Sequence, residues 1–152
     1  MQSRLGKIFH LSTRVLLGAL FLAASISKIA HPGEFANIIH NYQILPDSMI
    51  NIVAIVLPWL EGLLGIAIVT GVLLPGAVAV SNFLLAAFFS ALVYNLARGL
   101  NVHCGCFTTK ITGEPETTWY IVRDSSFLVL GLFVLVQVLR EKNIQKSHIS
   151  ID

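Results

Sequence analysis

Four long apolar segments, separated by shorter polar ones, dominate the hydropathy pattern of the chain. A membrane-spanning helix needs roughly 20 mostly apolar residues to cross a hydrocarbon core about 30 Å thick. The segments that meet this requirement are residues 8–29, 48–70, 76–97 and 118–139. The chain lacks the short alternating apolar and polar runs that are typical of transmembrane strands. The pattern therefore predicts an all-α integral membrane four-helix bundle.

The connection between the first two segments has a helical pattern of its own. Phe35, Ile38, Ile39 and Tyr42 recur at the spacing of one helix face, and Pro32 suits a first helical turn. A short helix with one apolar face lies in the membrane interface rather than across the bilayer. We therefore expect a short amphipathic interfacial helix between spans one and two, ending before Pro46.

Composition supports the membrane assignment. Hydrophobic residues make up 55% of the 152 positions and charged residues only 12%, against roughly 25% charged in typical soluble domains. So few charges exclude intrinsic disorder and nucleic-acid binding through a basic face, and two cysteines exclude a disulfide-rich scaffold. We expect a lipid bilayer as the surroundings of one domain, residues 1–140, followed by a cytoplasmic tail, residues 141–152.

The positions of lysine and arginine predict the orientation. Basic residues flank both ends of the chain, at Arg4 and Lys7 and again at Arg140, Lys142 and Lys146. Such residues favour the cytoplasmic side, and an even number of spans returns both termini to one side. We expect a multi-pass protein of the bacterial cytoplasmic (inner) membrane, with both termini cytoplasmic, the first and third connections outside, and the first segment retained rather than cleaved as a signal peptide.

The most specific chemistry lies in the third connection, where Cys104, Gly105 and Cys106 form a Cys-Gly-Cys sequence. A disulfide across so short a loop closes almost no chain, so it stabilises the fold little. Strain makes such a bond easier to reduce, which suits thiol–disulfide exchange in the oxidising space outside the membrane. His103 and Lys110 would favour a thiolate. Cys104, Cys106 and His103 are therefore the candidate catalytic residues, with Cys104 slightly favoured as the nucleophile.

Two other interpretations of the cysteine pair remain open. The pair can be an inert structural disulfide in an assembly subunit. It can also bind a soft metal such as Cu(I), Hg(II) or Zn(II) together with His103, His31 or His40, because thiolate and imidazole suit these ions. A metal conduit should continue with sulfur ligands through the membrane, yet the four spans contain no cysteine and only one methionine, Met49.

Charges inside the apolar segments need partners, since an ionised side chain in mid-membrane costs about 2.5 kcal/mol or more. Counting in from the cytoplasmic ends of their spans, Arg14 and Glu61 lie at similar depths. We therefore predict that Arg14 pairs with Glu61, with Pro58 bending the helix just before the acid. The pair can be purely structural, or it can form part of a proton path or a quinone head-group site.

A second polar cluster is expected near the outer ends of the helices, with Lys28 paired to Asp124. These side chains first anchor the helices at the interface, and they could also position a quinone or a protein partner. The members are Lys28, Tyr94, Asn95, Arg98, Arg123 and Asp124. The candidate cofactor-binding residues are accordingly Lys28, Arg98, Glu61 and Arg14. No motif for a tightly bound organic cofactor is present, so a quinone from the membrane is the carrier considered.

The order of several short motifs resembles that of the MauE/DoxX-like membrane proteins over residues 10–140. The matching pieces are residues 14–28 of the first span, 32–35, 42–46, Leu57-Pro58-Trp59-Leu60-Glu61-Gly62-Leu63-Leu64-Gly65 of the second span, and Cys104-Gly105-Cys106-Phe107. Family members usually continue this last motif with glycine, where the present chain has Thr108.

The resemblance implies a four-helix membrane protein linked to thiol–disulfide or sulfur redox chemistry. MauE is associated with methylamine utilisation and with maturation of a disulfide-rich dehydrogenase subunit, and DoxX relatives with sulfur oxidation that feeds quinones. Together, the residues and the resemblance predict a thiol–disulfide oxidoreductase. Its Cys-Gly-Cys pair would exchange electrons with a periplasmic thioredoxin-like or disulfide-containing partner, in a direction left open, and the chain would need a quinone or a second dithiol from a partner.

Overall fold

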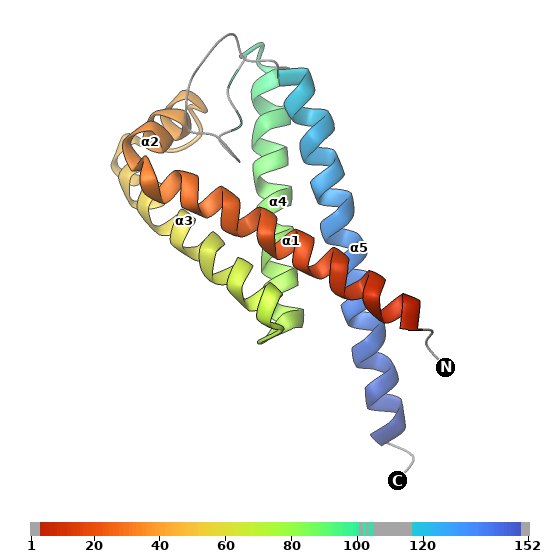
Figure 1. Cartoon of the computed structure of the whole chain (residues 1–152). Helices are drawn as coiled ribbons and strands as arrows, with labels where there is room; N and C mark the ends of the chain where they lie inside the picture. The colour runs from red at the N-terminus through yellow and green to blue at the C-terminus, as the bar shows by residue number, and fades with distance from the viewer. Residues whose placement is uncertain (1–3, 101, 103, 105–116, 150–152) are drawn as a thin grey trace.

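The computed structural model describes residues 4–100, 102, 104 and 117–149. The described part of the chain is entirely helical apart from turns and connections, in agreement with the predicted all-α class. Its helices, labelled in Figure 1, are α1 (Arg4–Ala30), α2 (Pro32–Asn41), α3 (Asp47–Thr70), α4 (Leu74–Ala97) and α5 (Thr117–Ile149).

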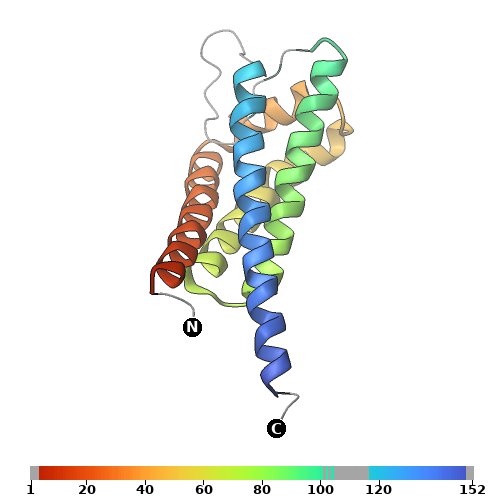
Figure 2. The same ribbon diagram turned by 90° about the vertical axis from the view of Figure 1, so that its right-hand side faces the viewer.

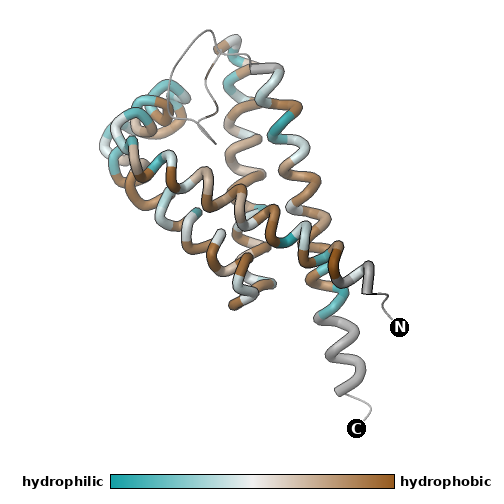
Figure 3. The backbone as a smooth tube through the Cα atoms, in the orientation of Figure 1, coloured by the Kyte–Doolittle hydropathy of each residue, from teal (hydrophilic) through white to brown (hydrophobic). Residues whose placement is uncertain are grey.

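Four of these helices are long and apolar enough to cross a membrane, which confirms the predicted spans. The stretches that qualify are Ile8–Ala30, Asp47–Thr70, Leu74–Ala97 and Trp119–Glu141. Figure 3 shows that apolar residues dominate the middle of these helices, while polar residues gather on α2 and near the helix ends. Large side chains such as Phe83 and Leu63 are more than half exposed, as expected where lipid rather than protein covers them. The protein is a multi-pass membrane protein.

The predicted short amphipathic helix is α2. It begins at Pro32, directly after the N-cap residue His31, and buries Phe35 and Ile38. It packs against α3 and α1. At its end the chain turns through Gln43, which has a positive φ of 49°. The end of the bundle at which α2 lies is called the α2 end below.

The four long helices form two antiparallel pairs, α1 with α3 and α4 with α5 (Figures 1 and 2). The first pair crosses closely because glycines meet at the contact. A Cβ on Gly65 would lie 3.0 Å from the carbonyl oxygen of Gly18 and 2.8 Å from the Cγ of Leu22. Small residues allow such close backbone approach between membrane helices. This contact sets the register of α1 against α3.

The last helix extends beyond the predicted fourth span. That span was predicted at residues 118–139, and α5 continues as a helix to Ile149, through most of the segment predicted to be a cytoplasmic tail. Figure 2 shows this last part extending beyond the other helices, at the end of the bundle where α1 begins. Residues after the apolar span therefore still form helix, because polar residues such as Glu141 and Arg140 are good helix formers.

Candidate functional site

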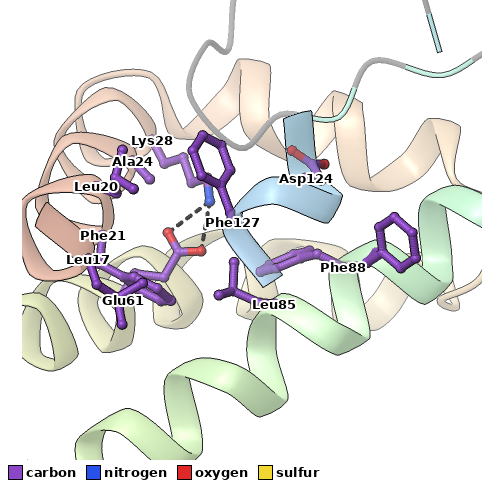
Figure 4. Close-up of a pocket in the computed structure, with 11 residues that line it drawn as sticks. Leu17, Leu20, Phe21, Ala24, Lys28, Glu61, Leu85, Phe88, Asp124 and Phe127 are labelled. Carbon is purple, nitrogen blue, oxygen red and sulfur yellow. Dashed lines mark hydrogen bonds and ion pairs between the residues drawn. The ribbon is translucent and has the colours of Figure 1, made fainter. Parts of the chain in front are cut away.

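A buried ion pair joins α1 to α3 near the α2 end. The Nζ of Lys28 donates to both carboxylate oxygens of Glu61, at 2.8 Å each (Figure 4). Lys28 is 1% exposed and Glu61 3%. The ammonium also lies 4.9 Å from the ring centroid of Phe35 and 5.2 Å from that of Phe88. Each charge depends on the other, because a lone buried charge in the membrane interior is costly.

The predicted pairing of Arg14 with Glu61 is wrong. The Nη2 of Arg14 donates instead to the carbonyl oxygen of Val69, at 3.2 Å. The prediction took the cytoplasmic ends of the two helices to be level, whereas their register places Arg14 opposite the end of α3. Glu61 lies eight residues before Val69, or about 12 Å along the helix axis. There the acid is within reach of Lys28.

The predicted pairing of Lys28 with Asp124 is also wrong. Asp124 pairs with its neighbour Arg123, whose Nε and Nη2 lie 3.0 and 2.9 Å from the Oδ1 of the carboxylate. Arg123 in turn lies over the ring of Tyr120, 5.1 Å from its centroid. Asp124 is 7% exposed, so it is a buried acid rather than the surface anchor that the sequence indicated.

The described cysteine, Cys104, is buried against Asp124. Cys104 is disulfide-bonded and 6% exposed, and its Sγ lies 2.9 Å from the Oδ2 of Asp124. The Tyr42 hydroxyl donates to the carbonyl oxygen of Cys104 at 3.3 Å. The other predicted catalytic residues, Cys106 and His103, lie outside the described residues.

Tyr42 remains a neutral hydrogen-bond donor at physiological pH. Burial raises the pKa of its phenol above the usual value of 10.0, and the nearby Asp124 carboxylate acts in the same direction. The hydroxyl that holds the Cys104 backbone is therefore a fixed part of the site rather than a titrating one.

Two cavities meet at this cysteine and acid. The first, of about 40 Å³, has Lys28, Glu61 and Asp124 in a wall that is otherwise apolar (Figure 4). The second, of about 230 Å³, is lined almost entirely by apolar side chains of α2, α3 and α4, and Cys104 forms part of its wall. Phe88 lines both cavities. Cys104 thus lines an apolar cavity, while Asp124 beside it lines a small cavity that contains two further charged side chains.

Two of the four predicted cofactor-binding residues lie together, and two lie elsewhere. Lys28 and Glu61 share the small cavity. Arg98 lies over the ring of Tyr94, 5.4 Å from its centroid, and its Nη2 lies 3.4 Å from the Oε1 of Gln43. Arg14 lies at the opposite end of the bundle from α2. Neither arginine lines the two cavities described above.

The two described histidines that were candidate metal ligands contact different groups. His31 Nδ1 lies 3.4 Å from the carbonyl oxygen of Ser27, and His40 Nε2 lies 3.7 Å from the carboxylate of Asp47. Within the described residues, no group of three or more His, Cys, Asp or Glu side chains could hold a metal ion. His103 and Cys106 lie outside that part of the chain.

Sequence reasoning missed the role of Asp124 in the surroundings of Cys104. A signal was present, because an acid within an apolar segment marks a functional position by default. The adjacent Arg123 made the pair look like an interface anchor. The contact of Cys104 with Asp124 on α5 has no local signature in the sequence.

The structure defines a class of protein: a polytopic membrane protein with a sulfur site at one end of its helix bundle. Its long apolar helices enclose a buried ion pair, and a disulfide-bonded cysteine lies beside an acid at that end. Comparison with known proteins agrees with this class. The family described as "Methylamine utilisation protein MauE" matches residues 6–137. The chain belongs to the MauE family.

Curated relatives carry the same family name. The chain is 35% identical over 123 residues to the methylamine utilization protein MauE of Paracoccus denitrificans, covering 80% of this chain and 65% of that protein. It is 33% identical over 131 residues to the protein of the same name from Methylorubrum extorquens, covering 83% and 67%. The chain thus spans about two thirds of the length of these relatives. No solved structure matches it.

Proposed function

We propose that this protein is a membrane thiol–disulfide redox protein that exchanges electrons through Cys104 and Cys106 with a thioredoxin-like or disulfide-containing partner in the periplasm. The main support for this proposal is the position of Cys104. Its sulfur lies 2.9 Å from the buried carboxyl group of Asp124, and the residue lines an apolar cavity. An inert disulfide needs neither feature. The proposal takes the two cysteines of the chain as one redox couple.

The exchange balances without another cysteine in this chain. Because Cys104 is 6% exposed, we assign the mixed disulfide with the partner to Cys106, although the sequence slightly favoured Cys104 for that role. In the direction that oxidises this chain, the Cys104 sulfur attacks this mixed disulfide, which closes the Cys104–Cys106 bond and releases the partner as a dithiol. The reverse reaction oxidises the partner. The first direction leaves a disulfide in this chain that must receive two electrons and two protons, and the reverse direction leaves a dithiol that must pass two electrons and two protons on.

We propose a membrane quinone as the carrier of those two electrons. A dithiol and a quinone give a disulfide and a hydroquinone, with both thiol protons ending on the quinone oxygens. The apolar cavity of about 230 Å³ beside Cys104 supports this choice, because pockets for apolar rings are mostly apolar with a few polar groups. Tyr42, whose hydroxyl bonds the Cys104 backbone, is the polar group in its wall.

The proposed setting is the bacterial inner membrane, with the cysteine connection on the periplasmic face and both termini in the cytoplasm. The distribution of basic residues supports this orientation. The relatives are named for methylamine utilisation, and we propose the same process as the setting of this chain.

Trapping the partner tests the exchange. A Cys104→Ser variant should accumulate a mixed disulfide through Cys106, because the resolving sulfur is absent. We expect a reductant-sensitive adduct with a periplasmic protein on a non-reducing gel, identified by mass spectrometry as thioredoxin-like or disulfide-containing. The Cys104→Ser/Cys106→Ser variant is the matched control and should give no adduct. The absence of any adduct from all single variants would overturn the proposed exchange.

A further inference from the structure

The two carboxylate oxygens of Asp124 face different groups. Oδ1 accepts from Arg123, at 3.0 Å from Nε and 2.9 Å from Nη2. Oδ2 lies 2.9 Å from the Sγ of Cys104. So short a separation between oxygen and sulfur suits a shared hydrogen, carried by the thiol when the sulfur is reduced and by the carboxyl when it is not. Arg123 therefore holds one oxygen in place while the other points at the sulfur.

We propose that Asp124 is the catalytic acid–base for Cys104, taking the thiol proton before the sulfur attacks and returning it when the disulfide opens. The inference rests on the proposed thiol–disulfide exchange and deepens it. Only a thiolate is an effective nucleophile, and a thiol buried in apolar surroundings resists ionisation. A carboxyl group already at the sulfur solves this problem, since it needs no water to reach the site.

The proton and the electrons balance in each step. In closing, the S–H bond of Cys104 breaks and its proton moves to the Oδ2 of Asp124. The thiolate attacks the Cys106 sulfur of the mixed disulfide, the new S–S bond forms, and the partner leaves as a thiolate that takes a proton from water. In opening, the partner's thiolate attacks Cys106, Cys104 leaves as a thiolate, and Asp124 returns the proton to it.

The groups around Asp124 allow both of its protonation states. Arg123 on α5 and Lys28 on α1 are positive and stabilise the carboxylate, while burial favours the neutral acid. Tyr42, at the end of α2, faces the same carboxyl and stays neutral. Glu61 on α3 lines the small cavity together with Asp124. Opposing influences of this kind suit a group that must both accept and donate a proton.

The small cavity beside Asp124 has room for a water molecule. Its volume of about 40 Å³ is enough for a water molecule, which needs roughly 10–15 Å³ of this kind of space. Asp124 lies in its wall together with the Lys28–Glu61 pair (Figure 4). A water there would link the acid beside the sulfur to the ion pair between α1 and α3.

The test compares reoxidation rates of the reduced full-length protein in detergent, with glutathione disulfide as the probe, from pH 6 to 9. Asp124→Asn keeps the shape of the side chain but cannot take a proton. We expect it to slow reoxidation by about 10²- to 10⁴-fold at pH 7, the usual contribution of a positioned acid–base. The deficit should shrink about tenfold per pH unit as hydroxide replaces the missing base. Asp47→Asn, on an exposed carboxylate that contacts His40, should match the wild type.

Asp124→Glu and a folding measurement keep the result interpretable. The glutamate retains a carboxyl group and should restore part of the rate, with the wild-type pH profile. Thermal unfolding identifies any variant that has lost its fold. Reoxidation of Asp124→Asn within threefold of wild type at every pH, or slowed by a factor independent of pH, would overturn the role of Asp124 alone. A wild-type protein that never reoxidises would instead overturn the proposed exchange, and this inference with it.

Discussion

Breaking the Lys28–Glu61 ion pair should destabilise the protein more than removing both charges together. The informative variants are Glu61→Gln, Lys28→Met and the double variant Lys28→Met/Glu61→Leu. Lys28 is 1% exposed, and in Glu61→Gln its ammonium loses the opposite charge and one of its two 2.8 Å acceptors, since the amide keeps a single carbonyl oxygen. In Lys28→Met the carboxylate of Glu61 is left in the same position.

Removing one member of a buried ion pair costs about 3–5 kcal/mol, because an uncompensated charge remains in an apolar place. The rings of Phe35 and Phe88 offset part of this cost for Lys28, since a cation over an aromatic ring is stabilised by about 0.5–2 kcal/mol. We therefore expect Glu61→Gln to lower the free energy of unfolding by about 3 kcal/mol, and Lys28→Met to lower it by at least as much. Replacing both residues by apolar ones is often neutral, so the double variant should lie within about 1 kcal/mol of the wild type.

Equilibrium unfolding in mixed detergent micelles, followed by circular dichroism, gives these free energies. Arg14→Gln is the control, because Arg14 makes one 3.2 Å hydrogen bond to a carbonyl oxygen and should lose only about 0.6–1 kcal/mol. A double variant as unstable as the sum of the two single ones would refute the reasoning, since the charges would then contribute independently. So would a larger loss for Arg14→Gln than for Lys28→Met.

Three further predictions follow from particular contacts. Gly65→Ala should destabilise by about 1–3 kcal/mol in the same unfolding assay, because its Cβ would lie 2.8–3.0 Å from α1; Gly76→Ala, with open space around it, should cost nothing, and equal losses would contradict the close helix crossing. Tyr42→Phe should cost about 1 kcal/mol through its lost hydrogen bond to Cys104. Burial raises the pKa of the Tyr42 phenol above its usual value of 10.0, so the phenol is protonated in both the folded and the unfolded state between pH 5.5 and 8.5. The loss of stability should therefore be equal at these two pH values, and a loss that depends on pH in this range would contradict this. In a cysteine-free background, a membrane-impermeant maleimide should label Leu73→Cys, on the exposed turn between α3 and α4, from the cytoplasm and His40→Cys from the periplasm; the reverse pattern would overturn the orientation.

The helices were predictable from the sequence because their causes are local. Span length follows from the thickness of the bilayer, and the apolar face of α2 follows from the spacing of Phe35 and Ile38. Such patterns need no knowledge of which helices touch. The continuation of α5 to Ile149 was not predictable in this way, since hydropathy marks where the membrane ends and says nothing about where a helix ends.

The partner of each buried charge was not predictable from depth alone. Arg14 and Lys28 lie fourteen positions apart on the same helix, and either could meet Glu61 until the glycine contact sets the register of α1 against α3. The same limit applies to Asp124, which lies twenty positions from Cys104 in the sequence and meets it through tertiary packing. The sequence indicated the cysteine pair as a candidate site, while the acid beside Cys104 emerged only from tertiary packing.

A redox titration of the cysteine pair tests the central claim most directly. The purified protein is equilibrated in thiol–disulfide buffers of graded potential, with and without a chelator, and its free thiols are counted with a mass tag. The account predicts that Cys104 and Cys106 change together as one two-electron couple, at a potential the chelator does not shift. A pair that stays oxidised at every mild potential, or thiols protected only when metal is present, would contradict it.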